Sequence, residues 1–348
     1  MCFWVLSNLN YKIKNILEYF IVMNEYRYDN MIYNRCGSSG LLLPIISLGL
    51  WHSFGDNADY ENMIELCRVA FDNGITHFDL ANNYGPPYGR AEENFGRILK
   101  DLFSVYRDEL IISTKAGYDM WAGPYGNWGS RKYLIASINQ SLKRLGIEYV
   151  DIFYHHRMDN NTPLEETMLA LSQIVSSGKA LYVGLSNYDG ATMEKASKIL
   201  ASLNCPFIIN QNRYSIFDRT IENNGLKLKS QKLSKGIIAY SPLAQGLLTD
   251  KYINDIPDDS RMKKDSRYLK YDVLTHNRKS QIVELNKLAI ERGETLAQMA
   301  LRWVLRDEEV VSVLIGASKV SQILENLEII KKNNITDKEL SIIDNLSL

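Results

Sequence analysis

The fold is constrained most by a unit that recurs along the chain: an amphipathic helix, a glycine, and a short apolar run that ends in polar residues. In one copy, apolar residues within 63–71 line one helical face, Gly74 follows, and the run 75–78 leads to Asp79. Glycine suits a helix end because it adopts the left-handed conformation without steric cost. The same punctuation recurs at three further glycines, Gly146, Gly178 and Gly236.

Eight apolar runs are candidate strands, and helical segments lie between most of them. Parallel neighbours need a crossover connection, so alternating strands and helices indicate a parallel sheet. Eight units fit an α/β fold of the closed (β/α)8 TIM-barrel type, formed as one domain by residues 25–348. An open doubly wound sheet is the alternative, but its dinucleotide-binding form carries Gly-x-Gly-x-x-Gly after a strand, and this sequence has none. The candidate strands lie near 46–50, 75–79, 110–115, 149–155, 180–186, 207–211, 237–241 and 310–315.

Two long segments fall outside the repeat. Residues 116–130, rich in aromatic residues and glycine, follow the third candidate strand, and the charged stretch 242–277 follows the seventh. Loops of this length in a compact domain are usually functional or disordered. The aromatic residues favour a functional site, so we expect long loops at the C-terminal face of the barrel.

Charge and cysteine usage exclude several classes of partner. The chain has 40 basic and 41 acidic residues, and this balance gives no net positive electrostatic potential that would hold nucleic acid. The four cysteines lack metal-ligand spacing, which indicates a reducing compartment and no metal site. Lys12, Lys14 and Glu18 interrupt the N-terminal apolar stretch, so no segment is long enough to span a membrane. We expect a cytoplasmic protein whose residues 1–24 are an extension outside the domain.

Polar residues gather where the candidate strands end. Loops after the strands converge on one mouth of a (β/α)8 barrel, which is where such barrels place their chemistry. Each residue alone is more often structural, because a loop after a strand is solvated in any case. Their combination is more informative than any single member. The residues are Asp79, Tyr84, Lys115, His156, Ser186, Asn187, Gln211, Ser241 and Ser318.

Four of these residues suit the reduction of a carbonyl group. Hydride transfer to a carbonyl carbon leaves an oxyanion that needs a proton, and a tyrosine with a reference pKa of about 10 is a weak donor at neutral pH. An ammonium beside Tyr84 is expected to lower that pKa, and Lys115 provides one. Asp79 is expected to keep the lysine charged and placed. A neutral His156 would orient the substrate oxygen through one N–H.

At these positions the chain resembles the aldo-keto reductase superfamily. Residues 79–85 read Asp-Leu-Ala-Asn-Asn-Tyr-Gly and match the family's Asp-x-Ala-x-x-Tyr-Gly. Residues 112–115 resemble its lysine strand and residues 150–156 its histidine strand. The resemblance covers roughly residues 27 to 346. It implies that the catalytic residues are Asp79, Tyr84, Lys115 and His156, the histidine being assigned by register in preference to His155.

The resemblance also implies NADPH as the cofactor. This family lays an extended dinucleotide across the barrel mouth, so a missing glycine fingerprint is expected. Ser318 and Lys319 would meet the 2′-phosphate, although Lys319 also reads as an exposed lysine at the start of the last helix. Lys251 and Arg261 would close over the pyrophosphate. The implied cofactor contacts are Trp51, Ser186, Asn187, Gln211, Tyr240, Ser241, Pro242, Leu243, Gln245, Gly246, Lys251, Arg261, Gly316, Ser318, Lys319, Gln322, Glu325 and Asn326.

Within the superfamily, the segments 48–55, 121–131, 156–159 and 256–262 look most like those of bacterial L-glyceraldehyde 3-phosphate reductases. This branch implies a small aldehyde substrate, methylglyoxal-like carbonyls included, and a homo-oligomer of four or more subunits. The sequence departs from the family at two cofactor loops. Asp250 stands where glycine is expected, and Asn212 stands where proline is expected.

Two other functions stay open on the sequence. The same branch resembles the β subunits of voltage-gated potassium channels, which hold NADPH as regulators, but those proteins usually have asparagine at the position of His156. A different barrel enzyme, such as a sugar-phosphate isomerase with an acid/base carboxylate, would bind no nicotinamide cofactor. Phosphate recognition is a hypothesis for which Arg131 and Arg157 are the candidate cations, and either one could equally pair with a helix carboxylate.

Overall fold

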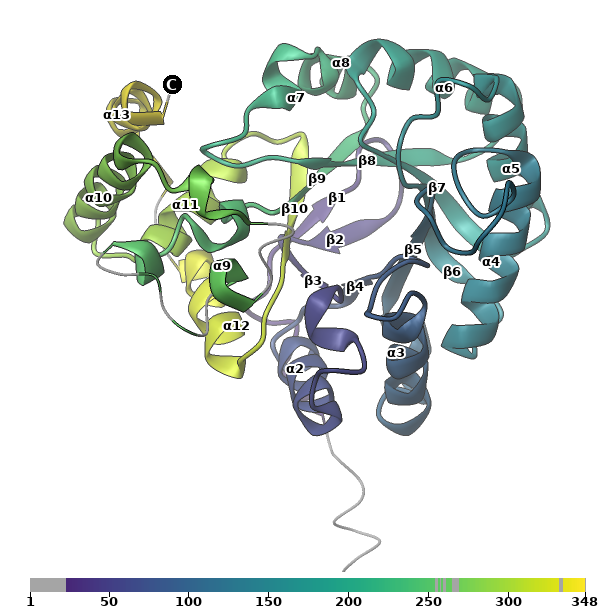
Figure 1. The fold of residues 1–348 in the computed structure, drawn as a ribbon, viewed down its shortest axis with the longest axis horizontal. Helices are drawn as coiled ribbons and strands as arrows, with labels where there is room; N and C mark the ends of the chain where they lie inside the picture. The colour runs from purple at the N-terminus through teal and green to yellow at the C-terminus, as the bar shows by residue number, and fades with distance from the viewer. Residues whose placement is uncertain are drawn as a thin grey trace, which may run out of the picture.

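Eight parallel strands close into a barrel around which the helices are arranged (Figure 1). The computed structural model describes residues 23–253, 256, 258, 261–264, 269–331 and 334–347. The strands run in chain order, and the last pairs with the first to close the ring. The predicted (β/α)8 barrel is therefore confirmed. Its strands are β3 (Ile46–Gly49), β4 (His77–Asp79), β5 (Ile111–Ala116), β6 (Val150–His155), β7 (Ala180–Ser186), β8 (Phe207–Arg213), β9 (Gly236–Tyr240) and β10 (Val310–Ile315).

The helices form the outer layer, in which several pack on the strands while α13 packs on α10. Gly74, Gly146 and Gly178 have φ of 83°, 67° and 74°, as expected for residues that end a helix. The helices are α2 (Tyr60–Asp72), α3 (Arg90–Asp101), α4 (Arg131–Leu145), α5 (Leu164–Ser176), α6 (Gly190–Ser202), α7 (Thr220–Asn223), α8 (Leu226–Lys232), α9 (Arg261–Lys264), α10 (His276–Glu291), α11 (Leu296–Val304), α12 (Val320–Leu327) and α13 (Asp337–Ser347).

The role predicted for Gly236 was wrong. Gly236 is the first residue of β9, and Ser234, with φ of 50°, is the left-handed residue after α8. A Cβ at Gly236 would lie 3.0 Å from Cys36 Sγ, so a larger residue would meet that buried thiol. Cys36 belongs to a hairpin that sequence reasoning did not predict, formed by β1 (Tyr33–Arg35) and β2 (Leu42–Pro44). Its buried Leu43 clusters with Ile208 and other strand residues of the barrel.

Before the hairpin, Met23 is already buried, and the backbone N–H of Asn24 donates to Asp72 at the end of α2 at 2.8 Å. Chain that packs on the domain thus reaches back to residue 23, two residues before the predicted domain start. Residues 1–22 of the predicted extension lie outside the described part of the chain.

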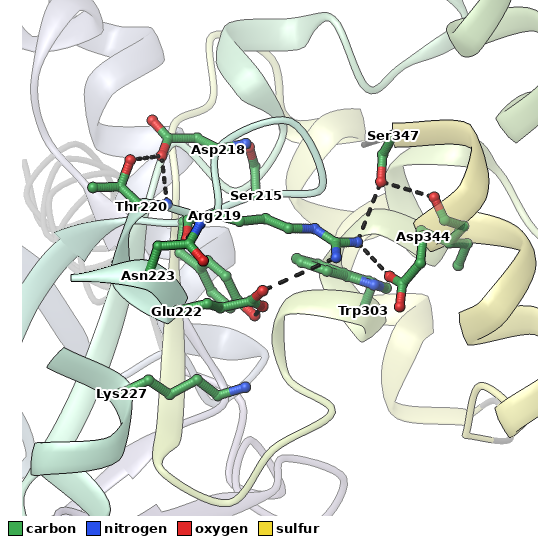
Figure 2. Close-up of polar contacts among 12 residues, drawn as sticks. Ser215, Asp218, Arg219, Thr220, Glu222, Asn223, Lys227, Trp303, Asp344 and Ser347 are labelled. Carbon is green, nitrogen blue, oxygen red and sulfur yellow. Dashed lines mark hydrogen bonds and ion pairs between the residues drawn. The ribbon is translucent and has the colours of Figure 1, made fainter. Parts of the chain in front are cut away.

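The C-terminal helix α13 is tied to the loop after β8 by a polar network (Figure 2). Arg219 Nη2 lies 2.5 Å from Asp344 Oδ1 and 3.2 Å from Ser347 Oγ, both on α13. The Arg219 guanidinium also lies over the ring of Trp303 in α11, at 4.6 Å from the ring centre. These contacts join the loop after β8, α11 and α13. None of the described helices is long and apolar enough to cross a membrane.

Candidate active site

A buried ion pair lies at the centre of the predicted site. Asp79 ends β4, and Lys115 lies near the end of the adjacent strand β5. Lys115 Nζ is 2.5 Å from Asp79 Oδ2 and also donates to the carbonyl oxygen of Leu80. Both side chains are almost fully buried. A buried charge is tolerated only when it is paired and hydrogen-bonded, so each residue requires the other.

Tyr84 lies beside this ion pair in the loop that follows β4. Lys115 Nζ is 4.8 Å from the centre of the Tyr84 ring, within the range in which an ammonium is attracted to an aromatic face. The ring of Trp51 lies on the same phenol at a centroid distance of 5.9 Å. The structure thus brings Asp79, Lys115 and Tyr84 together as predicted.

The expected direction of the Tyr84 pKa was wrong. Burial raises the pKa of Tyr84 well above its ordinary value, and the nearby charge of Asp79 raises it further. Burial also lowers the pKa of Lys115, while Asp79 opposes that shift. The Lys115 ammonium forms its ion pair with Asp79, and desolvation of the phenol is the largest influence on the pKa of Tyr84.

The two consecutive histidines point to opposite sides of β6, as neighbouring strand residues do. The ring of His156 lies 6.0 Å from the Tyr84 ring and packs edge-on against Tyr118 at 4.7 Å. Burial lowers the pKa of His156 well below its ordinary value, and Lys115 lowers it further, so this imidazole is neutral. His155 Nδ1 instead lies 2.7 Å from the hydroxyl of Tyr188, away from the mouth. The geometry favours His156 over His155 as the histidine of the site.

The residues predicted to contact the nicotinamide are hydrogen-bonded to proposed catalytic residues or to one another. Asn187 Nδ2 donates to the carbonyl oxygen of His156 at 2.9 Å, and Asn187 Oδ1 accepts from the Tyr240 hydroxyl at 2.8 Å. Gln211 Nε2 donates to Asp79 Oδ1 at 3.1 Å. Ser186 Oγ accepts from Asn187 Nδ2 at 3.1 Å. Proposed cofactor and catalytic residues therefore share one hydrogen-bonded cluster.

The loop after β9 fits the phosphate-bearing part of a dinucleotide. Ser241, Ala244 and Gln245 have φ of 51°, 47° and 59°, and left-handed residues of this kind form backbone concavities that bind anions. Gln245 Oε1 is buried and lacks a hydrogen-bond partner within the described part of the chain. The remaining predicted residues of this segment lie along it or just beyond it. They are Pro242, Leu243, Gly246 and, in the short 3₁₀ helix Asp250–Tyr252, Lys251. Arg261 begins α9, but its side chain lies outside the described residues.

The start of α12 fits a phosphate at the adenosine end. Ser318 and Lys319 are exposed there, and a helix N-terminus favours a negative charge. Nothing lies within 4 Å of the position that a Cβ would take at Gly316, which leaves room for a ligand. Gln322 Oε1 accepts from the Ser318 backbone N–H at 2.8 Å, so this side chain also holds the loop. Of the two remaining predicted contacts, Glu325 is exposed and Asn326 is buried. In the described residues, no cluster of histidine, cysteine and acidic side chains could hold a metal.

A (β/α)8 barrel that presents a phenol, a buried ammonium and a neutral imidazole at its mouth has the construction of a carbonyl oxidoreductase. Comparison with known proteins supports this class. The chain belongs to the aldo/keto reductase family, whose model matches residues 45–348. Members of the family are oxidoreductases that generally use a nicotinamide cofactor and a small-molecule substrate.

Individual relatives agree with the family. The chain is 54% identical over 324 residues to L-glyceraldehyde 3-phosphate reductase of Escherichia coli K12, and the match covers 92% of this chain and 94% of the relative. The protein of the same description from Escherichia coli O157:H7 matches equally well. The crystal structure of a thermostable aldo-keto reductase with the inhibitor epalrestat superposes with a TM-score of 0.71 at 30% identity. That match covers 91% of this chain and 100% of the solved one.

Sequence reasoning missed several partners of the predicted residues. Tyr118, which packs against His156, lies in the predicted aromatic loop but was not assigned a role. His77 is fully buried on β4, two positions before Asp79. Residues two apart on a strand face the same side, so this spacing was a readable signal that His77 points towards the same interior as Asp79.

Proposed function

We propose that this protein reduces small aldehydes with NADPH and that L-glyceraldehyde 3-phosphate and methylglyoxal-like carbonyls are its substrates. The observation that carries the proposal is the Asp79–Lys115 ion pair beside the Tyr84 ring, with the ring of a neutral His156 6.0 Å from the Tyr84 ring. The 54% identity to reductases described for L-glyceraldehyde 3-phosphate supports the choice of substrate.

Each residue of the tetrad has one step in the proposed reaction. Bound NADPH supplies the hydride that reaches the carbonyl carbon. Tyr84 gives its hydroxyl proton to the carbonyl oxygen, and the Lys115 ammonium stabilises the phenolate that remains. His156 is neutral, so it donates one N–H to the same oxygen and orients the substrate without adding a charge. Asp79 holds the ammonium in place.

We assign the cofactor to the barrel mouth, along the loop after β9 and the start of α12. Ser186, Asn187 and Gln211 would hold the carboxamide, and the ring of Tyr240 would stack on the nicotinamide. Lys319 and Ser318 would hold the 2′-phosphate, a charge-assisted contact of roughly 1.5 to 3 kcal/mol that distinguishes NADPH from NADH. Gln245 Oε1, which is buried and has no hydrogen-bond partner among the described residues, supports this placement.

Arg157 is the best candidate for the substrate's phosphate. Its guanidinium lies 3.6 Å from the centre of the Trp128 ring and 4.2 Å from that of Tyr118. Its Nε donates to the carbonyl oxygen of Gly117 at 2.9 Å. The Tyr118 ring packs on His156, so these contacts hold a planar cation next to the reacting centre. Arg131 lies instead at the exposed start of α4.

The Tyr84→Phe variant tests the proposed chemistry. It removes the proton donor and keeps the ring, so we expect NADPH oxidation with L-glyceraldehyde 3-phosphate to fall about 10³-fold. The dissociation constant for NADPH, measured by tryptophan quenching, should stay within about twofold, because the hydroxyl makes no cofactor contact in this proposal. A wild-type protein that oxidises no NADPH with either aldehyde, or a phenylalanine variant at full rate, would refute it.

The same assay separates the alternatives. A regulatory module resembling channel β subunits predicts NADPH binding with turnover far below one per minute, and a cofactor-free barrel isomerase predicts no quenching at all. The presence of His156, where the channel proteins usually have asparagine, favours catalysis.

A further inference from the structure

A chain of buried polar side chains leads away from the ion pair, and the proposed reaction does not use it. Ser113 Oγ donates to Asp79 Oδ1 at 2.6 Å. His77 Nε2 lies 2.9 Å from Ser113 Oγ, and His77 Nδ1 lies 2.9 Å from Ser47 Oγ. Ser47 Oγ in turn lies 2.7 Å from Ser312 Oγ. The four outer members of the chain have no exposed surface, and they come from β10, β3, β4 and β5.

The direction of every hydrogen bond in this chain follows from the carboxylate at one end and the neutral His77 ring within it. The Asp79 carboxylate can only accept, so the single hydroxyl proton of Ser113 points to it. Ser113 Oγ must then accept from His77, which requires a proton on Nε2. Burial lowers the pKa of His77 to about 4, so the ring is neutral and its Nδ1 carries a lone pair.

The same reasoning continues to the far end. His77 Nδ1 accepts the proton of Ser47, and Ser47 Oγ therefore accepts from Ser312. All four donors consequently point towards the carboxylate. Hydrogen bonds aligned in this way polarise one another, and they stabilise negative charge on the final acceptor more than one isolated bond would.

We propose that His77 is a positioning residue that acts through Ser113 to keep Asp79 an acceptor and Lys115 an ammonium beside the proton donor Tyr84. The inference rests on the proposed role of Tyr84 and extends it to residues outside the tetrad. Without the donated proton of Ser113, Asp79 would compete more strongly for a proton of Lys115. The phenolate left after proton transfer would then lose part of its stabilising charge.

Several charged and titratable groups surround this chain and the ion pair in which it ends. Glu92 acts on Lys115, and the centre of the Tyr154 ring lies 5.8 Å from Lys115 Nζ. His77 faces Asp79 and Lys115, whose charges act on it in opposite directions. Around Tyr84 the titratable groups are Asp79, Lys115, His156, Tyr118 and Tyr240. Among these, the Asp79–Lys115 ion pair is what links His77 to Tyr84.

The tautomer of His77 provides a test that does not depend on a substrate. With ¹⁵N-labelled histidine, long-range ¹H–¹⁵N correlation spectra of the whole protein distinguish a proton on Nε2 from one on Nδ1, and the His77→Gln spectrum assigns the signal. We expect the neutral Nε2–H form at pH 7. The Nδ1–H form would leave Ser113 with no donor from His77 and would overturn the proposal.

Two substitutions at His77 form a matched pair. A glutamine amide nitrogen can stand where Nε2 stands, whereas asparagine reaches only the position of Nδ1. We therefore expect His77→Gln to keep kcat within about threefold and His77→Asn to lower it by about tenfold or more, the size seen for outer hydrogen-bond partners in other sites. KM for the aldehyde and Kd for NADPH should stay within about twofold in both.

The pH profile distinguishes positioning from a general loss of structure. We expect the basic limb of kcat, which reports Tyr84, to move up by at least about half a pH unit in His77→Asn and to stay in place in His77→Gln. Ser113→Ala should reproduce the asparagine result, and it decides the question if the asparagine variant does not fold. A basic limb that does not move in His77→Asn, or a kcat for His77→Gln no higher than that for His77→Asn, would overturn the positioning role.

These outcomes are separable from a failure of the proposed function. An inert wild-type protein, or an active Tyr84→Phe, removes the proton donor on which both ideas depend. If the wild type is fully active and the basic limb of kcat does not move in His77→Asn or Ser113→Ala, only the role of His77 is refuted.

Discussion

The burial of His77 makes a prediction about stability at low pH. Its pKa falls from 6.5 to about 4 on folding, mainly because burial disfavours the imidazolium. Between those two values the unfolded chain binds a proton that the folded protein rejects, so stability present above pH 6.5 is lost as the pH falls towards 4. For these pKa values, lowering the pH from 7 to 5 removes about 2 kcal/mol through His77 alone.

The assay compares urea unfolding of the wild type and His77→Gln at pH 7 and pH 5. Glutamine does not titrate, so the stability lost between the two pH values should be smaller by about 2 kcal/mol in the variant. His155, whose pKa is also lowered to about 4, contributes equally to both proteins and cancels. His276 is exposed, and His276→Gln serves as the matched control that should behave as the wild type. Equal losses in wild type and His77→Gln would refute the burial argument.

Three further changes test other parts of the structure. Lys319→Glu should weaken NADPH binding by about 10- to 100-fold and leave NADH binding unchanged, as measured by tryptophan quenching; an unchanged cofactor preference contradicts the 2′-phosphate assignment. Arg157→Met should raise KM for L-glyceraldehyde 3-phosphate by about tenfold or more and leave KM for methylglyoxal unchanged. Arg131→Met is the matched control. Equal effects of Arg157→Met on both aldehydes would contradict a phosphate contact. Gly184→Ala would place a Cβ 2.2 Å from the buried Tyr154 ring. It should therefore lower the free energy of unfolding in urea by about 1 to 3 kcal/mol, and wild-type stability would show that the ring can move aside.

Much of the barrel was predictable because its strands are buried on both faces and read as apolar runs. The helix ends at Gly74, Gly146 and Gly178 were predictable because only local backbone conformation decides them. Gly236 follows the same sequence pattern, but a glycine stands there for a different reason. The hairpin that carries Cys36 packs against it, and a contact between segments 200 residues apart leaves no local signal.

The candidate site shows the same division. Its tetrad could be named because the residue types and spacings resemble a known family. The partners of Asp79 other than Lys115 could not, because they depend on strand register. Asp79 pairs with Ser113 across β4 and β5, and this register brings the serine hydroxyl to the carboxylate. Gln211 reaches the same carboxylate from β8, across the barrel interior, where chain spacing carries no information.

The pKa of Tyr84 shows why pairwise charge reasoning was insufficient here. An ammonium near a phenol lowers the pKa of the phenol, whereas desolvation raises it. In this site burial and Asp79 both raise the pKa of Tyr84. Tyr84 therefore keeps its proton at neutral pH. In the proposed mechanism that state is the one reduction needs, since the donor is always loaded, whereas alcohol oxidation would need the rarely populated phenolate as its base. Burial of the phenol thus keeps the proposed donor protonated while making it a weaker acid, and the Lys115 ammonium matters most once the proton has left.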